Sequence, residues 1–310
     1  MVHKKNKFFF ISLILLFNIY LKANLDDYLY QYRDVPSYSN YGTIGLIQMP
    51  TARMLPAGSL GISWSHSEPY LNGSILAYPF SWFEASFQYT DINNALYSDV
   101  KLFSGRQSYK DKGFDIKLKI FNESTILPET SIGIRDIAGT AVFGAEYLVF
   151  SKKIIPNLDI TFGLGWGNLN GNPITNPLKY IDSRFKDRAG KLANTQGGEL
   201  SPKRYFTGNA GTFGGLEYTI KNLNGLRLKL EYDGTNYKSE GFPDGRESFS
   251  FATTPVKSSD SDINFGIVYP VNEFVHLKLS FIKGNTINFG FSLSGNLGKK
   301  RSKLTKNNKQ

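Results

Sequence analysis

The chain has 310 residues, of which 41% are hydrophobic and 15% are aromatic, and it contains no cysteine. The absence of cysteine excludes a disulfide framework and a thiolate metal site, and it predicts that the chain is not a lipoprotein. The net charge of +10 comes from the two ends, because residues 1–23 hold four basic residues, residues 299–310 hold six, and neither range holds an acidic one. The rest of the chain balances 26 basic against 26 acidic residues. A nucleic-acid site is a basic patch on the folded body, so no nucleic-acid partner is predicted.

The first 23 residues have the features of a signal peptide. Lys4, Lys5 and Lys7 form a basic start, and residues 8–21 form a mostly apolar run. This run is shorter than the about 20 apolar residues that a transmembrane helix requires. We therefore predict a signal peptide over residues 1–23, with an uncleaved anchor as the alternative, and export of the remaining chain.

Residues 24–57 show no sustained period and are expected to form a lead-in segment on the periplasmic side. Within this segment, residues 41–56 are bounded by glycine and proline, which favours a connecting loop. A segment that plugs or gates a barrel lumen is the alternative. Of the two, the sequence favours the plain loop.

From residue 58 onward, polar and apolar residues alternate with a period of two. In residues 115–120 and 159–167, apolar side chains occupy every second position, while the other positions are charged, small or glycine. This period is typical of β-strands with two different faces. Twelve such runs follow one another: residues 58–66, 71–79, 83–89, 113–121, 130–136, 143–150, 158–167, 212–220, 226–232, 263–269, 274–281 and 286–294.

An even number of runs near the ~9 to 11 residues of a membrane-spanning strand is typical of bacterial barrels. The fold prediction is therefore all-β, a transmembrane antiparallel up-and-down barrel over residues 58–294, followed by a basic tail over residues 295–310. The connections after the second, fourth, sixth, eighth and tenth runs are short, whereas the long ones follow the third, seventh and ninth. All long loops then lie on one side, as in outer-membrane barrels. A soluble β-sandwich, the alternative fold, gives no reason for such sorting.

The longest connection, residues 168–209, contains apolar residues at helical spacing. They are Leu178, Ile181, Phe185, Ala189 and Leu192. We expect a surface loop with a short stabilising helix, with an external lid or an inward-folded constriction as the alternative.

Several segments of the chain resemble one protein family. Residues 107–115, 133–140, 146–152 and 163–167 resemble, in this order, motifs of the YjbH/GfcD family, and the similarity extends over residues 41–294. The resemblance implies a bacterial outer-membrane barrel that is encoded with exopolysaccharide and capsule genes. It also implies a part in polysaccharide export or surface assembly. Family members are about twice as long and have a second barrel, so functions that need the second half are not predicted for this chain.

If the alternation holds, charged side chains line the lumen. The candidates for contact with polysaccharide are Lys117, Lys119, Arg135, Glu146, Arg227, Lys229, Glu231 and Lys278. Lys117, Lys119 and Arg135 lie on adjacent strands and form a basic strip that could track an anionic sugar polymer. The alternative, which the sequence slightly favours, is that acidic residues on neighbouring strands pair with these cations and fill a narrow interior.

Two further functions remain as alternatives. The main one is a non-catalytic outer-membrane scaffold that anchors a periplasmic or lipoprotein partner. A lipid hydrolase is a minor one, because His66 lies near Ser65, but a catalytic triad is defined by geometry and no Gly-x-Ser-x-Gly motif is present.

No cofactor and no metal are predicted. Gly163, Gly165 and Gly167 have a period of two within a strand and therefore do not form a dinucleotide-binding loop. Asp260 and Asp262 lack the glycine and glutamate spacing of a calcium loop. The expected surroundings are outer-membrane lipid, with polysaccharide and periplasmic or lipoprotein partners.

Overall fold

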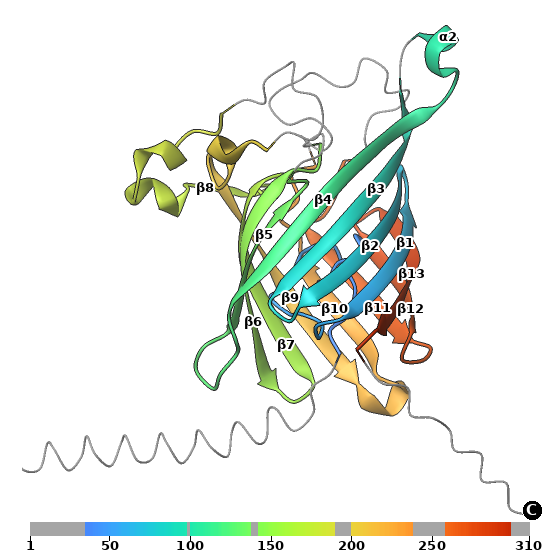
Figure 1. Ribbon diagram of the computed structural model, residues 1–310, viewed down its shortest axis with the longest axis vertical. Helices are drawn as coiled ribbons and strands as arrows, with labels where there is room; N and C mark the ends of the chain where they lie inside the picture. Colours follow the sequence, from blue (N-terminus) through green and yellow to red (C-terminus); the bar gives the residue numbers. More distant parts are fainter. Residues whose placement is uncertain (1–34, 98–99, 138–141, 190–199, 238–257, 299–310) are drawn as a thin grey trace, which may run out of the picture.

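The computed structural model describes residues 35–97, 100–137, 142–189, 200–237 and 258–298, which form an antiparallel β-barrel (Figure 1). The strands are β1 (Ser59–Ser67), β2 (Tyr70–Phe80), β3 (Phe83–Leu96), β4 (Ser108–Phe121), β5 (Glu129–Arg135), β6 (Ala145–Ile155), β7 (Leu158–Gly167), β8 (Pro173–Ile174), β9 (Ala210–Ile220), β10 (Leu226–Tyr232), β11 (Ile263–Pro270), β12 (Val275–Ile282) and β13 (Thr286–Asn296).

The barrel closes through pairing of its first and last strands. Each long strand pairs with its neighbour in the sequence, β7 pairs with β9, and β13 pairs with β1. Twelve strands of the described chain thus form the wall, while β8 is a two-residue addition beside β9. The predicted transmembrane up-and-down barrel is confirmed.

Helical elements in the described residues are short and lie in the connections. They are α2 (Lys101–Ser104), η1 (Pro177–Tyr180), η2 (Ser183–Phe185), η3 (Pro202–Arg204) and η4 (Lys221–Leu223). Over the described ranges, none has the length and apolar character needed to cross a membrane as a helix.

The helix predicted within residues 168–209 is wrong. The side chains of Asn176 and Asp182 each accept a hydrogen bond from the backbone N–H two residues later. Each therefore starts a separate 3-10 turn, and no continuous helix forms over these residues. The expected apolar face is not buried, since Ile181 is 80% exposed. Leu192 lies outside the described residues.

The two faces of the wall differ as the alternation predicts. Outward-facing side chains on neighbouring strands are apolar and exposed, for example Leu279 opposite Phe289. Inward-facing side chains such as Ser63 and Asn264 are polar and almost completely buried. An apolar surface that surrounds the whole wall is stable against lipid and not against water.

Connection length separates the two ends of the barrel. At one end, here called the turn end, the connections are residues 81–82, 122–128, 156–157, 221–225 and 271–274. At the opposite loop end, drawn at the top of Figure 1, the longer connections are residues 97–107, 136–144, 168–209 and 233–262. The predicted sorting of loop lengths is confirmed.

Residues 37–55, here called the plug, lie inside the lumen. The plug passes into the barrel from the turn end and returns there to β1, with antiparallel bridges Tyr38↔Ile44 and Gly45↔Pro50. Most of its apolar side chains, among them Leu46, are almost completely buried, and Leu46 packs in one cluster with residues of β6 and β9.

The sequence preference for a plain connecting loop over residues 41–56 is therefore wrong. The charged inner wall requires partners, and the plug backbone supplies them. Residues 1–34 and 299–310, which include the predicted signal peptide and most of the basic tail, lie outside the described residues.

Candidate functional site

Glu231 on β10 holds the tip of the plug. Its carboxylate is completely buried and accepts hydrogen bonds from the backbone nitrogens of Ile47 (2.7 Å), Gln48 (2.9 Å) and Met49 (2.9 Å). Three consecutive N–H groups around one anion form a concave nest, and bonds to a charged acceptor are stronger than neutral ones. Glu231 thus substitutes for the backbone partners that an irregular segment lacks.

Lys229, two residues earlier on the same face of β10, binds the plug through carbonyl oxygens. Its Nζ donates to Tyr38 O (3.1 Å), Gly45 O (2.8 Å) and Leu46 O (2.7 Å). The ammonium also lies 3.4 Å from the carboxylate of Glu217, which is its direct neighbour on β9. The charge of Lys229 is therefore neutralised by Glu217 of the wall, while its N–H groups bind carbonyl oxygens of the plug.

Lys117 and Lys278 act in the same way from other parts of the wall. Lys117 Nζ lies 2.9 Å from Glu84, which is directly opposite on β3, and donates to Arg53 O at 3.0 Å. Lys278 Nζ donates to Ser39 O at 2.7 Å. Both ammonium groups are buried within the barrel.

The predicted basic strip is occupied by intramolecular partners. Arg135 donates to Gln48 O at 2.8 Å and stacks over the ring of Tyr41, and Lys119 lies 3.5 Å from Glu129. Together with Lys117, these residues bind the plug or neighbouring acids and do not present a free cationic track. The alternative of paired charges in a filled interior describes these residues correctly.

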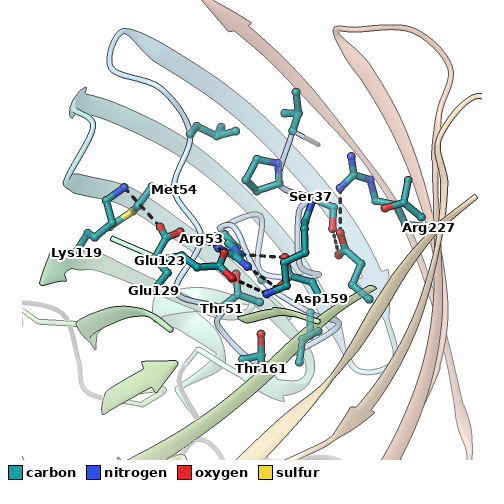
Figure 2. Close-up of a pocket in the computed structure, with 18 of the residues that line it drawn as sticks. Ser37, Thr51, Arg53, Met54, Lys119, Glu123, Glu129, Asp159, Thr161 and Arg227 are labelled. Atoms are coloured by element: carbon teal, nitrogen blue, oxygen red, sulfur yellow. Dashed lines mark hydrogen bonds and ion pairs between the residues drawn. The ribbon is translucent and has the colours of Figure 1, made fainter. Parts of the chain in front are cut away.

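Arg53 fastens the returning arm of the plug at the turn end (Figure 2). Its guanidinium binds Asp159 through two nitrogens, at 2.7 and 2.9 Å, and also binds Glu123 at 2.6 Å and Glu129 at 2.9 Å. Burial acts to lower the pKa of Arg53, but the three carboxylates outweigh it and hold the pKa above its usual value.

Glu123 belongs to the turn between β4 and β5, and its contact with Arg53 changes the pKa of its carboxyl. Burial acts to raise the pKa of its carboxyl, but the charge of Arg53 and the backbone N–H of Lys153 outweigh it. The pKa of Glu123 therefore lies below its usual value of 4.5. Arg53 and Glu123 were not predicted as site residues, although the acids near the turn ends of β5 and β7, Glu129 and Asp159, required a cation.

Glu146 does not lie in the lumen, and its prediction as a lumen residue is wrong. It pairs with Trp166 on β7 and shares the outward-facing positions of Leu148 on its own strand. The residue is buried where described parts of the connection over residues 168–209 lie against the outer wall, and Phe206 N donates to its carboxylate at 3.0 Å. Arg188 of that connection binds the Glu146 carboxylate at 2.7 and 2.9 Å.

The residues considered for lipid hydrolysis do not meet. Ser65 points inward and donates to Asn40 O at 2.7 Å, whereas His66 points outward against Trp64 and Phe289. Adjacent residues of one strand point to opposite faces, so His66 cannot activate Ser65.

A cavity of about 690 Å³ lies between the plug and the turn end (Figure 2). Its polar lining comes from wall strands, from turns and from the plug residues Ser37, Thr51 and Arg53, and its apolar lining comes mainly from the plug and the residues beside it. The residues that line it include Val35, Pro36, Ser37, Leu46, Thr51, Arg53, Met54, Leu55, Pro56, Lys119, Asn122, Glu123, Glu129, Lys153, Asn157, Asp159, Thr161, Glu217, Thr219 and Arg227. Of the predicted contact residues, the structure brings Lys119 and Arg227 together in this cavity.

Fold and site together define a transmembrane β-barrel whose lumen is filled by a segment of its own chain. The chain belongs to the YjbH family, since the family model described as "Exopolysaccharide biosynthesis protein YbjH" matches residues 37–310. The family resemblance seen in the sequence is thereby confirmed.

One curated relative and two solved structures illustrate these similarities. The chain is 40% identical over 274 residues to "Uncharacterized lipoprotein YjbH" of Escherichia coli (strain K12), covering 88% of this chain but 37% of the relative. It thus spans little more than a third of the relative's length. Two solved porin structures are similar in fold alone. The KdgM porin has 8% identity and a TM-score of 0.37, and the match covers 76% of this chain and 97% of the porin. The NanC porin has 8% identity and a TM-score of 0.34, and the match covers 76% of this chain and 98% of the porin.

Proposed function

We propose that this chain is an outer-membrane barrel that takes part in the export or surface assembly of an exopolysaccharide. The observation that carries the proposal is the match of one exopolysaccharide family model to the barrel and the plug together. The apolar outer wall and the sorting of loop lengths support a place in a bilayer. The short turns on one side and the long loops on the other support a place in the outer membrane, because bacterial outer-membrane barrels have this arrangement.

The plug determines how such a barrel takes part. In this conformation Glu231 and Lys229 hold the plug inside the lumen, in the space that a polymer would have to cross. Transport through this chain therefore requires that the plug leave its wall contacts. The energy for that step must come from a partner or a ligand, because several buried charges lose their partners together.

Deletion of the gene tests the proposal. Surface polysaccharide is measured by a carbohydrate stain and by composition analysis, in the deletion strain and after complementation with the full chain. Loss on deletion and recovery on complementation is expected. Unchanged surface polysaccharide in the deletion strain would refute the proposed function.

A non-catalytic scaffold is the second candidate, and the fixed plug favours it. A barrel that is permanently filled can still anchor a partner in the membrane. Reconstitution in liposomes separates the two candidates: sugar flux that appears on addition of cell-envelope extract supports export through the barrel, whereas a barrel that stays impermeable under all conditions supports the scaffold. A lipid hydrolase has no support from His66 and Ser65, which lie on opposite faces.

A further inference from the structure

The connection over residues 168–209 is fastened to the outside of the barrel wall. Its short strand β8 pairs with β9, and Arg188 binds the outward-facing Glu146 at 2.7 and 2.9 Å. Phe206 packs edge to face on Trp166 of β7, with the ring centroids 5.2 Å apart. The turns η1 and η2, drawn in yellow-green, lie beside the wall and not over the opening of the barrel (Figure 1).

These contacts lie at the loop end of the lipid-exposed wall. Glu146 is the second residue of β6, Trp166 is the last but one of β7, and each is 2% exposed. Phe162, four positions before Trp166 on the same face, is 50% exposed, and four residues of a strand span about 13 Å. Because the interfaces of a bilayer lie at the two ends of the apolar band of such a barrel, the connection meets the wall where hydrocarbon gives way to headgroups.

Hydrogen bonds hold η1 and η2 in place relative to these contacts. The side chain of Asn176 donates to Phe185 O at 2.9 Å and to Phe206 O at 2.8 Å. It also accepts from the backbone nitrogen of Leu178 at 3.0 Å, and the backbone nitrogen of Gly208 donates to Phe185 O at 3.1 Å. The two turns are therefore tied to the residues that bind the wall, and their exposed side chains keep a fixed place beside it.

An apolar surface is exposed on this part of the connection. Tyr180 and Ile181, at the bend between η1 and η2, are each 80% exposed, and Ile174 of β8 is 41% exposed. Neighbouring apolar side chains that stay exposed in a fixed segment are typical of an interaction surface. Tyrosine is also enriched at the boundary of a bilayer, because its ring is apolar and its hydroxyl group is polar. The chemistry of this surface thus fits the level at which it lies.

An excess of positive charge accompanies the apolar surface. The described part of the connection contains six basic residues and two acidic ones, so three positive charges remain in excess after Arg188 has paired with Glu146. Anionic headgroups attract such a surface, and the combination of basic and apolar side chains is typical of segments that lie in a membrane interface. The basic residues are Lys179, Arg184, Lys186, Arg188, Lys203 and Arg204, and the acidic ones are Asp182 and Asp187.

We propose that the connection over residues 168–209 binds the bilayer surface beside the barrel, at the loop end, through anionic lipid headgroups. Tyr180 and Ile181 enter the boundary region of the bilayer, and basic side chains of the same turns contact phosphate groups of the lipid. Glu146 holds the connection at the level where both contacts form, which gives a reason for a carboxylate on the outer face of a membrane barrel. The proposal does not depend on a part in polysaccharide export.

A single nitroxide label tests the proposal, because the chain has no cysteine of its own. Ile181→Cys is labelled in the purified full chain, which is reconstituted in vesicles of phosphatidylcholine with or without phosphatidylglycerol. Paramagnetic resonance then compares collisions of the label with oxygen, which concentrates in hydrocarbon, and with a water-soluble nickel complex on both sides of the membrane. With phosphatidylglycerol present, we expect oxygen collisions to dominate at position 181, and to decrease relative to nickel collisions when this lipid is left out.

Leu102→Cys is the matched control. Leu102 is also an apolar, fully exposed residue at the loop end, but it lies at the α2 tip beyond the wall, so nickel collisions should dominate there in both kinds of vesicle. Lys179→Gln combined with Lys186→Gln should lower the ratio of lipid-contacting to aqueous label at position 181 about 25-fold, since each cation near an anionic surface contributes about fivefold. Heat-modifiable gel mobility verifies that each variant is folded.

Any of four results would overturn the proposal. The label at position 181 is as accessible to the nickel complex as the label at position 102, or its contact with lipid is the same without phosphatidylglycerol. The two lysine substitutions leave that contact unchanged, or spin–spin broadening between labels at position 181 shows that the surface binds a second copy of this chain.

Discussion

Residue 231 shows how one wall side chain can replace secondary structure for another segment. The plug backbone at Ile47, Gln48 and Met49 forms no strand, yet its three N–H groups converge on the Glu231 carboxylate. In a buried site a carboxylate is costly unless it is hydrogen-bonded, and an irregular backbone is costly for the same reason. Each group therefore removes the penalty of the other.

Glu231→Gln should loosen the plug without changing the shape of the wall. The amide has one acceptor oxygen and no charge, so the three N–H groups lose most of their bonding, at a cost of about 1.5–3 kcal/mol for each strong bond that is lost. We expect faster proteolysis within residues 37–55 of the folded barrel. Glu273→Gln, in an exposed turn, is the control. Equal cleavage of the two variants would contradict the anchoring role.

Glu123 makes the fastening of the plug dependent on pH. Because the pKa of Glu123 in the folded protein lies below its usual 4.5, its ionised form contributes stability that is complete above that value. The contribution is lost as the pH falls through the lowered pKa. The stability difference between the wild type and Glu123→Gln, measured by thermal unfolding in detergent, should therefore be constant near neutral pH and shrink in acid. A difference that stays constant down to about pH 3 would contradict it.

Two residues show what alternation can and cannot locate. Lys229 was correctly predicted to point inward, because Leu228 and Leu230 flank it on the outward face. Glu146 was assigned to the lumen with the other charged residues of the alternating runs, although Leu148 shares its face and indicates the outer wall. The period of two predicts the correct face for Glu146, whereas its charge does not, since a long loop can cover a charge outside a barrel.

At the scale of elements, the plug was the part for which the sequence prediction, a plain connecting loop, was wrong. Strands can be recognised in the sequence because their partners are adjacent in the chain and their two faces alternate. The plug has no period, and its partners are distant, with Glu231 lying 184 positions after Ile47. The available signal was the set of charged residues that alternation places inside the barrel, because buried charged groups need partners.

Replacement of residues 37–55 by a short Gly-Ser linker should convert the barrel into a pore. Without the plug, Lys117, Lys229 and Lys278 lose backbone partners and become hydrated, and water enters the lumen. Ion current across planar bilayers should rise from background to stable channels. Deletion of the α2 tip, residues 101–104, is the control and should leave the current at background. A silent barrel without its plug would show that the wall side chains close the lumen by themselves.

At the scale of the whole molecule, the barrel could be predicted because independent features agreed. Alternation predicted the strands, and the parity of loop lengths predicted which connections lie at each end of the barrel. β3 and β4 are longer than predicted, because they continue to pair beyond the barrel wall up to Leu96 and Ser108. Position relative to lipid follows from the same geometry. The outer wall is apolar around its circumference, so a charge in its middle should be far more costly than a charge at its edge.

Leu279→Arg and Leu297→Arg test this depth dependence. Leu279 lies in the middle of β12, faces outward and is 53% exposed, whereas Leu297 follows the end of β13 at the turn end and is 78% exposed. An arginine at the bilayer centre should destabilise the folded barrel by about 2–4 kcal/mol, and one near the interface by about 0–1 kcal/mol. Both costs are measured by reversible denaturant unfolding in lipid vesicles. If the two substitutions cost the same small amount, the outer wall does not contact the hydrocarbon core, and the transmembrane arrangement of β12 and β13 would have to be abandoned.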